Sequence, residues 1–188
     1  MQKKTIIGLV GPMVAGKGTI ATYLEEHYQA ATFRFSDVLR ETLTLYDLEL
    51  SRTNLQNLST ILRHQFGENI LAKAMFRRVR EAQQPLIVID GIRRLVDIEL
   101  VPSLGSFTLI SVHADDRIRF ERLQKRTENS DDQKKTFEAF LQDQQQEAER
   151  EIAAVAAQAQ LQVDNNGDIN QLYARIDSII QTIHGNSN

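Results

Sequence analysis

The sequence contains no cysteine and no tryptophan, and only three of its 188 residues are proline. The lack of cysteine excludes disulfides, thiolate zinc sites and a cysteine nucleophile, and it fits a reducing compartment. No apolar run approaches the roughly 20 residues that cross a bilayer, and the run after the amino-terminal Met1-Gln-Lys-Lys4 is too short for a signal-peptide core. We therefore expect a soluble, cytoplasmic protein with no membrane partner.

Lysine is also scarce relative to arginine. The chain has 7 lysines against 15 arginines, and its 22 basic and 25 acidic residues give a formal net charge of −3. This balance argues against general binding of nucleic acid, which needs a strongly basic surface. Arginine grips phosphate and carboxylate groups through two parallel hydrogen bonds. The bias towards arginine therefore points to small anionic ligands.

The apolar residues gather in five short runs that predict β-strands. Most of the runs are continuous rather than alternating, as in parallel strands that are buried on both faces. They are Thr5–Val10, Thr32–Phe35, Leu86–Asp90, Phe107–Val112 and Leu161–Asp164. Helical patterns separate them, over 17–28, 37–47, 53–65, 68–83, 94–101, 115–127, 133–158 and 169–183. This alternation predicts a single α/β domain over 1–188, with a five-stranded parallel sheet flanked by helices.

Two long helical stretches interrupt the alternation. The stretch 36–84 holds three helical patterns and no strand, which predicts a helical insertion beside the sheet. The pattern over 133–158 is rich in Gln, Glu and Ala and has few large apolar residues after Leu141. We interpret this second stretch as a solvated helix, with a short lid over about 127–150 as the alternative.

A glycine-rich loop follows the first predicted strand. Gly11-Pro-Met-Val-Ala-Gly-Lys-Gly-Thr19 has the G-x-x-x-x-G-K spacing of a phosphate-binding loop, and a helical pattern follows it. The backbone N–H groups of such a loop form an anion-binding nest, and the helix N-terminus adds its positive dipole end. Lys17 would reach the β- and γ-phosphates. Gly18 replaces the usual Ser or Thr after the lysine, so the nearest hydroxyl for Mg²⁺ belongs to Thr19.

The ending Gly-Lys-Gly-Thr of this loop resembles the loop of adenylate kinase and other nucleoside-monophosphate kinases. Further segments resemble parts of that family in the same order, namely Phe35–Arg40, Leu86–Arg94, the arginines 119, 122 and 126, and Asp164–Gly167. The resemblance covers nearly the whole chain and is strongest to short archaeal-type nucleotide kinases and deoxynucleoside-monophosphate kinases. It implies a P-loop NTPase fold, a monophosphate-binding insertion over 36–84, and ATP and Mg²⁺ as cofactors.

The loop and the resemblance together suggest a role for each candidate residue. Catalytic roles are expected for Lys17, Arg94, Arg122 and Arg126. Contacts with ATP are expected for Gly11, Val14, Ala15, Gly16, Lys17, Gly18, Thr19, Arg122, Asn165 and Gly167. Contacts with the acceptor nucleotide are expected for Ser36, Asp37, Arg40, Arg63, Arg93 and Arg94. The expected metal-binding residues are Asp90 and Thr19.

Some of these residues have a second interpretation. Asp90 ends a buried strand at the sheet edge where α/β folds bind ligands, but it could instead cap the following helix. Asp37 could likewise cap the helix that it precedes. Arg93 stands where the family has a proline, so the anion-binding arginine at this turn could be Arg93 or Arg94.

The main functional hypothesis is phosphoryl transfer from ATP to a nucleoside or deoxynucleoside monophosphate. Such an acceptor is already an anion, so catalysis needs positioning and charge stabilisation rather than a base. A first alternative is a small-molecule kinase such as a dephospho-coenzyme A kinase, with Asp37 as the base for a hydroxyl acceptor. A second is an ATP-binding module that acts through a partner. It is favoured by a lid stretch with glutamine, at 142 and 144–146, where relatives carry arginine.

Overall fold

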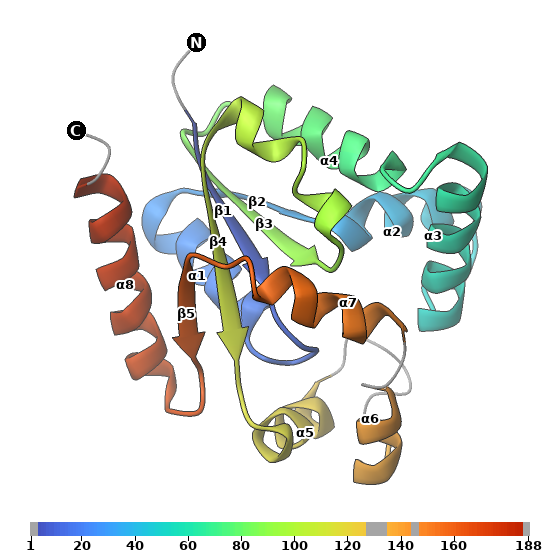
Figure 1. Ribbon diagram of the computed structural model, residues 1–188. Coiled ribbons are helices and arrows are strands. Elements are labelled where there is room, and N and C mark those ends of the chain that lie inside the picture. Colours follow the sequence, from blue (N-terminus) through green and yellow to red (C-terminus); the bar gives the residue numbers. More distant parts are fainter. Residues whose placement is uncertain (1–3, 127–134, 144–146, 186–188) are drawn as a thin grey trace.

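A computed structural model describes residues 4–126, 135–143 and 147–185 and contains a five-stranded, all-parallel sheet (Figure 1). The strand order is β2-β3-β1-β4-β5. The strands are β1 (Lys4–Val10), β2 (Ala31–Arg34), β3 (Leu86–Ile92), β4 (Gly105–His113) and β5 (Leu161–Asp164). Each lies close to one of the predicted runs. The prediction of an α/β fold with a five-stranded parallel sheet is thus confirmed.

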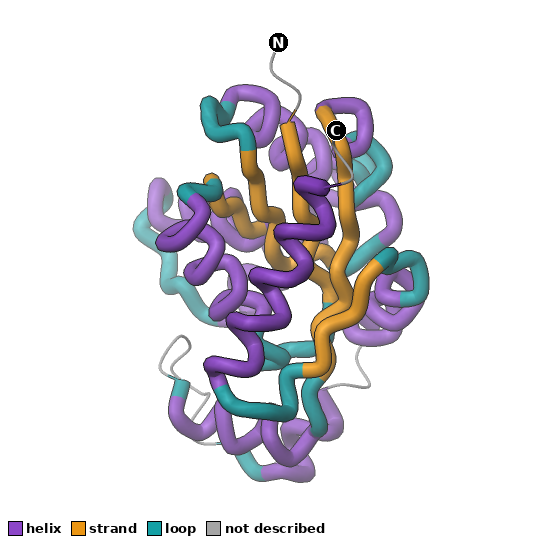
Figure 2. Tube along the Cα trace, turned by 90° about the vertical axis from the view of Figure 1, so that its left-hand side faces the viewer, coloured by secondary structure: helices purple, strands orange, loops and turns teal. Residues whose placement is uncertain are grey.

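Helices cover both faces of this sheet (Figures 1 and 2). Those preceding β4 are α1 (Lys17–Tyr28), α2 (Phe35–Leu45), α3 (Arg52–Phe66) and α4 (Ile70–Glu81), and those following it are α5 (Asp116–Lys125), α6 (Phe137–Asp143), α7 (Glu147–Ala156) and α8 (Ile169–Gly185). On one face, α1 and α8 pack on side chains such as Ile7 and Leu9. On the other, α4 and α7 pack on side chains such as Ile6 and Val10. The continuous apolar runs therefore supply two cores, one on each side of the sheet.

The three helical patterns expected between 36 and 84 correspond to α2, α3 and α4, which lie between β2 and β3. The helix α2 begins at Phe35, directly after the last residue of β2. The carboxylate of Asp37 accepts the backbone N–H of Arg34 at 3.0 Å, which satisfies a donor at the start of the helix. Asp37 therefore has the capping role, the second of its two interpretations.

The pattern over 94–101 does not form an α-helix. This segment instead contains two short 3₁₀ helices, over Leu95–Asp97 and Val101–Leu104. The Asp97 carboxylate accepts the backbone N–H groups of Arg93 and Arg94, which draws the chain into a tight turn. Pro102 then disfavours the helical conformation in the residue before it. These two local effects outweigh the helical periodicity.

The pattern over 133–158 gives two helices, α6 and α7, rather than one. They bury different surfaces. Phe140 of α6 is fully buried against the side chain of Arg119, whereas Ile152 and Val155 of α7 pack in the core over the sheet. Of the expected lid over 127–150, residues 127–134 and 144–146 lie outside the described residues. No helix in the described part of the chain is both long enough and apolar enough to span a bilayer.

The helices α1 and α8 are joined by a cluster of tyrosines around one carboxylate. Asp177 accepts hydrogen bonds from the hydroxyls of Tyr28, at 2.7 Å, and Tyr23, at 2.8 Å. The ring of Tyr23 also stacks on that of Tyr173, with 4.0 Å between centroids. The hydrogen bond from Tyr28, followed by that from Tyr23, lowers the pKa of Asp177. The bond to Asp177, followed by burial, raises the pKa of Tyr28 to about 12.

These shifts predict how the tyrosine cluster contributes to stability at different pH. The lowered pKa of Asp177 stabilises the fold at neutral pH, and this contribution is lost as the pH falls below the ordinary value of 3.8 through the folded-state pKa. The raised pKa of Tyr28 gives a contribution that is lost as the pH rises through about 12. We expect Tyr28→Phe to lower the free energy of unfolding by about 1 kcal/mol at neutral pH, a modest value because the pair is partly solvated.

Urea unfolding at several pH values tests this prediction. The difference between Tyr28→Phe and the parent should shrink as the pH falls below the ordinary value of 3.8 and Asp177 is protonated in the folded state. Tyr46→Phe is a matched control, because Tyr46 is exposed and distant in sequence from the cluster. A difference that is the same at both ends of the pH range would contradict the assignment.

Candidate active site

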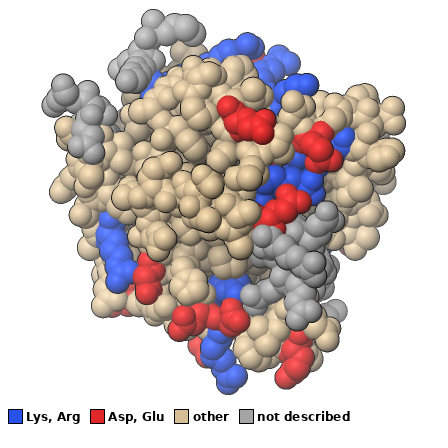
Figure 3. Space-filling view, in the orientation of Figure 1, with Lys and Arg blue, Asp and Glu red and all other residues tan. Residues whose placement is uncertain are grey.

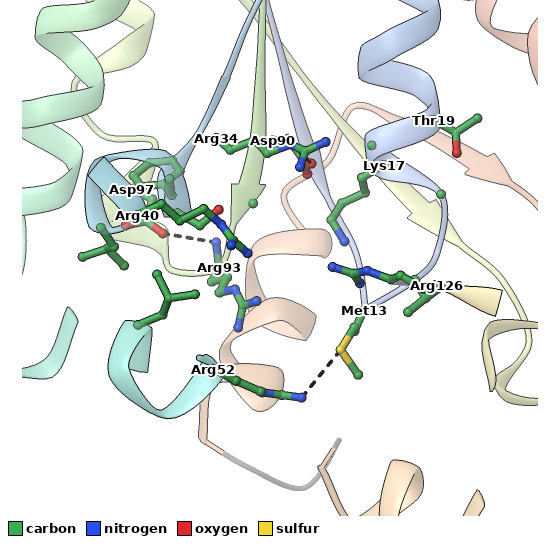
Figure 4. A pocket seen from close by; sticks show the side chains of 18 of the residues that line it. Met13, Lys17, Thr19, Arg34, Arg40, Arg52, Asp90, Arg93, Asp97 and Arg126 are labelled. Atoms are coloured by element: carbon green, nitrogen blue, oxygen red, sulfur yellow. Dashed lines mark hydrogen bonds and ion pairs between the residues drawn. The ribbon is translucent and has the colours of Figure 1, made fainter. Parts of the chain in front are cut away.

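The phosphate-binding loop connects β1 to α1 at the carboxyl edge of the sheet (Figure 4). Val14 and Gly16 both have left-handed backbone conformations, with φ of 61° and 104°. For a β-branched residue such as Val14 this conformation is strained, and strain of this kind is typical of ligand-binding loops. The Lys17 ammonium donates to the carbonyls of Gly11 at 2.8 Å and Pro12 at 2.9 Å. Lys17 therefore closes over the loop where a phosphate would lie.

Asn165, at the end of β5, holds the loop in place. Its side chain is 5% exposed, and its Nδ2 donates to the carbonyl of Ala15 at 2.8 Å. A Cβ atom at position 16 would lie 2.1 Å from this same Nδ2. Gly16 is thus required both by its positive φ and by the approach of Asn165. This contact links the phosphate loop to the turn that the sequence predicted to contact ATP.

Two arginines of α5 secure the same region. Arg119 is fully buried and donates to the carbonyls of Ala114, at 3.0 Å, and Met13, at 3.1 Å, so it supports the loop from below. Arg122 donates through Nη2 to the carbonyl of Asn165 at 2.8 Å. Burial lowers the pKa of Arg122, and its Nη1 is buried without a hydrogen-bond partner among the described residues. An unsatisfied guanidinium donor beside the phosphate loop is suited to an anionic oxygen.

A cavity of about 920 Å³ extends from the loop to the helices α2 and α3. Eight arginines line it, namely Arg34, Arg40, Arg52, Arg63, Arg93, Arg94, Arg122 and Arg126. Among the described residues, the acidic side chains that line it are Asp90 and Asp97. Figure 3 shows both signs of charge mixed around the margins of the outer face. The arginine bias of the sequence is thus concentrated in this cavity.

Asp90 lies in β3 at the centre of the cavity wall. Its Oδ1 is buried and has no hydrogen-bond partner among the described residues. Its Oδ2 lies 3.6 Å from the Nε of Arg34. A carboxylate oxygen left open at this edge suits Mg²⁺, which is commonly held by one or two carboxylates together with substrate phosphates. No group of three or more acidic or histidine side chains gathers into a metal site in the described part of the chain. Asp90 would therefore hold the ion together with the nucleotide phosphates.

The predicted metal ligand Thr19 lines the cavity but is exposed on α1, and Figure 4 places it apart from Asp90. The two predicted metal-binding residues therefore lie in different parts of the cavity wall. Asp90 is accordingly the better supported of the two.

An ion-pair network, buried at Arg63 and Asp97 and more exposed at Arg94, shapes the far side of the cavity. Arg63 donates to Oδ1 of Asp97 at 3.0 Å and to the carbonyl of Glu68. Arg94 pairs with Glu68 at 2.6 Å and with Glu151 of α7 at 3.3 Å. Both arginines line the cavity, but carboxylates engage them. The described contacts thus give Arg63 and Arg94 a structural role that the sequence did not predict.

In the turn after β3, the neighbouring side chains of Arg93 and Arg94 have different surroundings. Arg94 is held by Glu68 and Glu151, whereas the side chain of Arg93 is exposed and extends into the cavity (Figure 4). The geometry therefore favours Arg93 over Arg94 as the anion-binding residue of this turn.

Most of the other predicted residues come together in this cavity, and three do not. Those that line it are Val14, Gly16, Lys17, Gly18, Thr19, Ser36, Arg40, Arg122, Arg126, Asn165 and Gly167. Gly11 instead packs against β4, where a Cβ atom would lie 2.1 Å from the carbonyl oxygen of Val112. Ala15 is buried. Asp37 caps α2 and does not line the cavity, so its contact with the acceptor stays a prediction.

The sequence analysis missed several residues of the wall. Arg34 ends β2 at the carboxyl edge of the sheet, and this position was the signal that could have identified it. Arg52 opens α3, and its Nη1 lies 3.7 Å from the sulfur of Met13 in the phosphate loop. Gln56, Ser59 and Thr60 follow on the same helix and also line the cavity. Their spacing places them on one helical face.

Comparison with known proteins gives this geometry a context. The chain is 28% identical over 183 residues to UPF0200 protein MJ1399 of Methanocaldococcus jannaschii, covering 96% of this chain and 91% of that protein. It is 29% identical over 185 residues to a UPF0200 protein of Thermococcus gammatolerans, covering 95% of each.

Solved structures share the fold. The shikimate kinase of Bacteroides thetaiotaomicron superposes with a TM-score of 0.66 at 17% identity, covering 96% of this chain and 98% of that one. The protein TT1252 of Thermus thermophilus superposes with a TM-score of 0.60 at 16% identity, covering 96% and 98%. The fold is thus that of the P-loop kinases. The family described as "AAA domain" matches residues 7–166, which is most of the sequence, and the chain belongs to that family.

Proposed function

We propose that this protein transfers a phosphoryl group from ATP to a nucleoside or deoxynucleoside monophosphate. The observation that carries the proposal is the distribution of arginines in one continuous cavity. Arg122 and Arg126 lie at the phosphate-loop end, and Arg40 and Arg93 lie at the end formed by α2 and the turn after β3. A second group of guanidiniums away from the ATP phosphates suits an acceptor that carries its own phosphate.

The wall of the cavity also suits a nucleoside. Gln56, Ser59 and Thr60 present an amide and two hydroxyls from one face of α3. Leu39 and Leu71 line the cavity from α2 and α4. Apolar side chains next to a few hydrogen-bonding groups are the usual environment of an aromatic heterocycle with polar edges. These residues therefore support a nucleobase next to the acceptor phosphate.

The chemistry follows from the charges around the transferred group. The attacking phosphate oxygen is already an anion, so no side chain has to remove a proton. Lys17, Arg122 and Arg126 would neutralise charge on the transferred group, and the unsatisfied Nη1 of Arg122 would gain its partner there. Mg²⁺ bound at Asp90 would supply further neutralisation and help to orient the phosphates. Arg40 and Arg93 would hold the acceptor in line.

The rival assignment to a hydroxyl-acceptor kinase has less support. Solved structures with this fold include shikimate kinases, one of them in complex with shikimate. A hydroxyl acceptor needs a base, and the sequence offered Asp37 for that role. Its carboxylate accepts the backbone N–H of Arg34 as a cap of α2, and Asp37 does not line the cavity. The described contacts therefore favour an acceptor that needs no base.

Measurement of ADP release with a panel of acceptors tests the proposal. The panel contains the common ribo- and deoxyribonucleoside monophosphates, dephospho-coenzyme A and shikimate. We expect at least one monophosphate to stimulate turnover, and Arg93→Met to raise the acceptor KM about tenfold or more with little change in the KM for ATP. Arg77→Met, which removes an exposed arginine of α4, is the matched control.

The outcomes separate the three hypotheses. Stimulation by dephospho-coenzyme A or shikimate alone would establish the hydroxyl-acceptor alternative. Tight ATP binding without stimulation by any member of the panel would favour a binding module. An acceptor KM that Arg93→Met leaves unchanged would remove Arg93 from the acceptor site.

A further inference from the structure

Arg34 and Asp90 occupy equivalent positions on neighbouring strands. The strands β2 and β3 pair in parallel with Arg34 opposite Asp90, so both side chains emerge at the carboxyl edge of the sheet. The Nε of Arg34 lies 3.6 Å from Oδ2 of Asp90, and the two side chains are 42% and 12% exposed. Figure 4 shows the guanidinium of Arg34 beside the Asp90 carboxylate, on the side of the cavity that faces α1.

The same guanidinium reaches the phosphate loop. A Cβ atom at Gly18 would lie 3.2 Å from Nη2 of Arg34, so this group stands next to the first turn of α1. The positive group beside Asp90 therefore occupies the space between the carboxylate and the phosphate-binding helix. A divalent cation bound to nucleotide phosphates would lie in that space. In this structure the Arg34 guanidinium faces Asp90 from that space.

We infer that Arg34 serves two anions in turn, first Asp90, as in this structure, and then the acceptor phosphate once a divalent cation and nucleotide are bound at Asp90. Two cations cannot share one side of a carboxylate without repulsion, so a metal ion at Asp90 disfavours the ion pair with Arg34. Arg34 lines the same cavity as Arg40 and Arg93, and its long side chain can turn towards them. The second half of this inference rests on the proposed monophosphate acceptor.

This change of partner by Arg34 couples the binding of the acceptor phosphate to the binding of metal-bound nucleotide. Because the acceptor phosphate gains Arg34 only after Asp90 has released it, metal-bound nucleotide should raise the affinity for the monophosphate. By linkage, the monophosphate raises the affinity for metal-bound nucleotide by the same factor. We expect a factor of about five or more. The protein would thereby assemble its charge-stabilising groups only when both substrates are present.

Calorimetric titration of a monophosphate, with and without MgADP, tests the coupling. The probe is the best acceptor of the panel, or AMP if none stimulates turnover. The parent should bind it about fivefold more tightly with MgADP, whereas Arg34→Met should bind it weakly and equally in both conditions. Arg93→Met, which removes the same charge from the same cavity, should weaken binding in both conditions and keep the fivefold ratio. Asp90→Asn should bind the probe without MgADP about as tightly as the parent binds it with MgADP.

A second measurement needs no acceptor. Electron paramagnetic resonance of free Mn²⁺ reports the affinity of each ADP complex for the metal, and Arg34→Met should raise this affinity about threefold relative to Arg93→Met. A metal affinity that does not rise, or a coupling that survives in Arg34→Met, would overturn the inference. If no monophosphate binds any of the proteins while the metal affinity rises as expected, the proposed acceptor fails and the competition at Asp90 stands. Thermal unfolding of each variant verifies that it is folded.

Discussion

Replacement of Lys17 by alanine is expected to lower acceptor-dependent ADP formation by about two to three orders of magnitude. Lys17 is the first residue of α1, and its ammonium now donates to two carbonyls of the loop, at 2.8 and 2.9 Å. Transfer of these hydrogen bonds to the β- and γ-phosphates places a full positive charge where charge develops in the transition state. Alanine leaves the loop backbone in place but removes this charge.

Steady-state assays with the best acceptor measure the effect, and Lys73→Met provides the control. Lys73 is exposed on α4 and does not line the cavity, so its replacement should leave turnover within about twofold of the parent. A Lys17→Ala protein that is folded and retains more than about a tenth of the parent turnover would refute a phosphoryl-transfer role for this loop.

Replacement of Asp97 by alanine is expected to lower the free energy of unfolding by about 3–5 kcal/mol. Asp97 is 2% exposed, and its Oδ1 accepts from Arg63 at 3.0 Å. Its Oδ2 accepts the backbone N–H groups of Arg93 at 3.1 Å and Arg94 at 3.0 Å. Alanine leaves a buried guanidinium without its nearest counter-charge, with the Glu68 carboxylate 3.9 Å away, and two backbone donors without an acceptor. Urea unfolding measures the loss.

A double variant separates charge pairing from packing at this position. Asp97→Asn keeps an acceptor for the backbone N–H groups, and Arg63→Met removes the buried cation. Because an unpaired buried charge is the main source of the loss, the double variant should be more stable than the sum of the two single changes predicts. Strictly additive losses would show that the ion pair is not the stabilising element.

Much of the fold was predictable because the strands are marked by composition alone. Runs such as Thr5–Val10 are apolar throughout, and burial on both faces of a parallel sheet requires this. The phosphate loop was equally visible, since its backbone conformation demands particular residues at fixed spacing. Both signals are local in the sequence, so each can be recognised from this one sequence.

The remaining features depend on contacts between distant segments. The pairing of Arg34 with Asp90 depends on which strands become neighbours, and the sheet order places β3 rather than β1 beside β2. Asp97, whose carboxylate forms the tight turn after β3, is paired with Arg63, which lies 34 residues earlier. The preference for Arg93 over Arg94 likewise depends on carboxylates from α7 and from the segment before α4. No local pattern encodes these partners.

The anchoring of the phosphate loop also has a consequence for the order in which the protein folds. Met13 is held by Arg119, 106 residues later, and Ala15 is held by Asn165, 150 residues later. Contacts of such long sequence separation form only after the intervening chain has been closed into a loop, with its cost in entropy. The amino-terminal strand, loop and helix can therefore leave the ribosome long before the nucleotide site is complete. The geometry of the loop thus depends on Asn165, directly after β5, as much as on β1 itself.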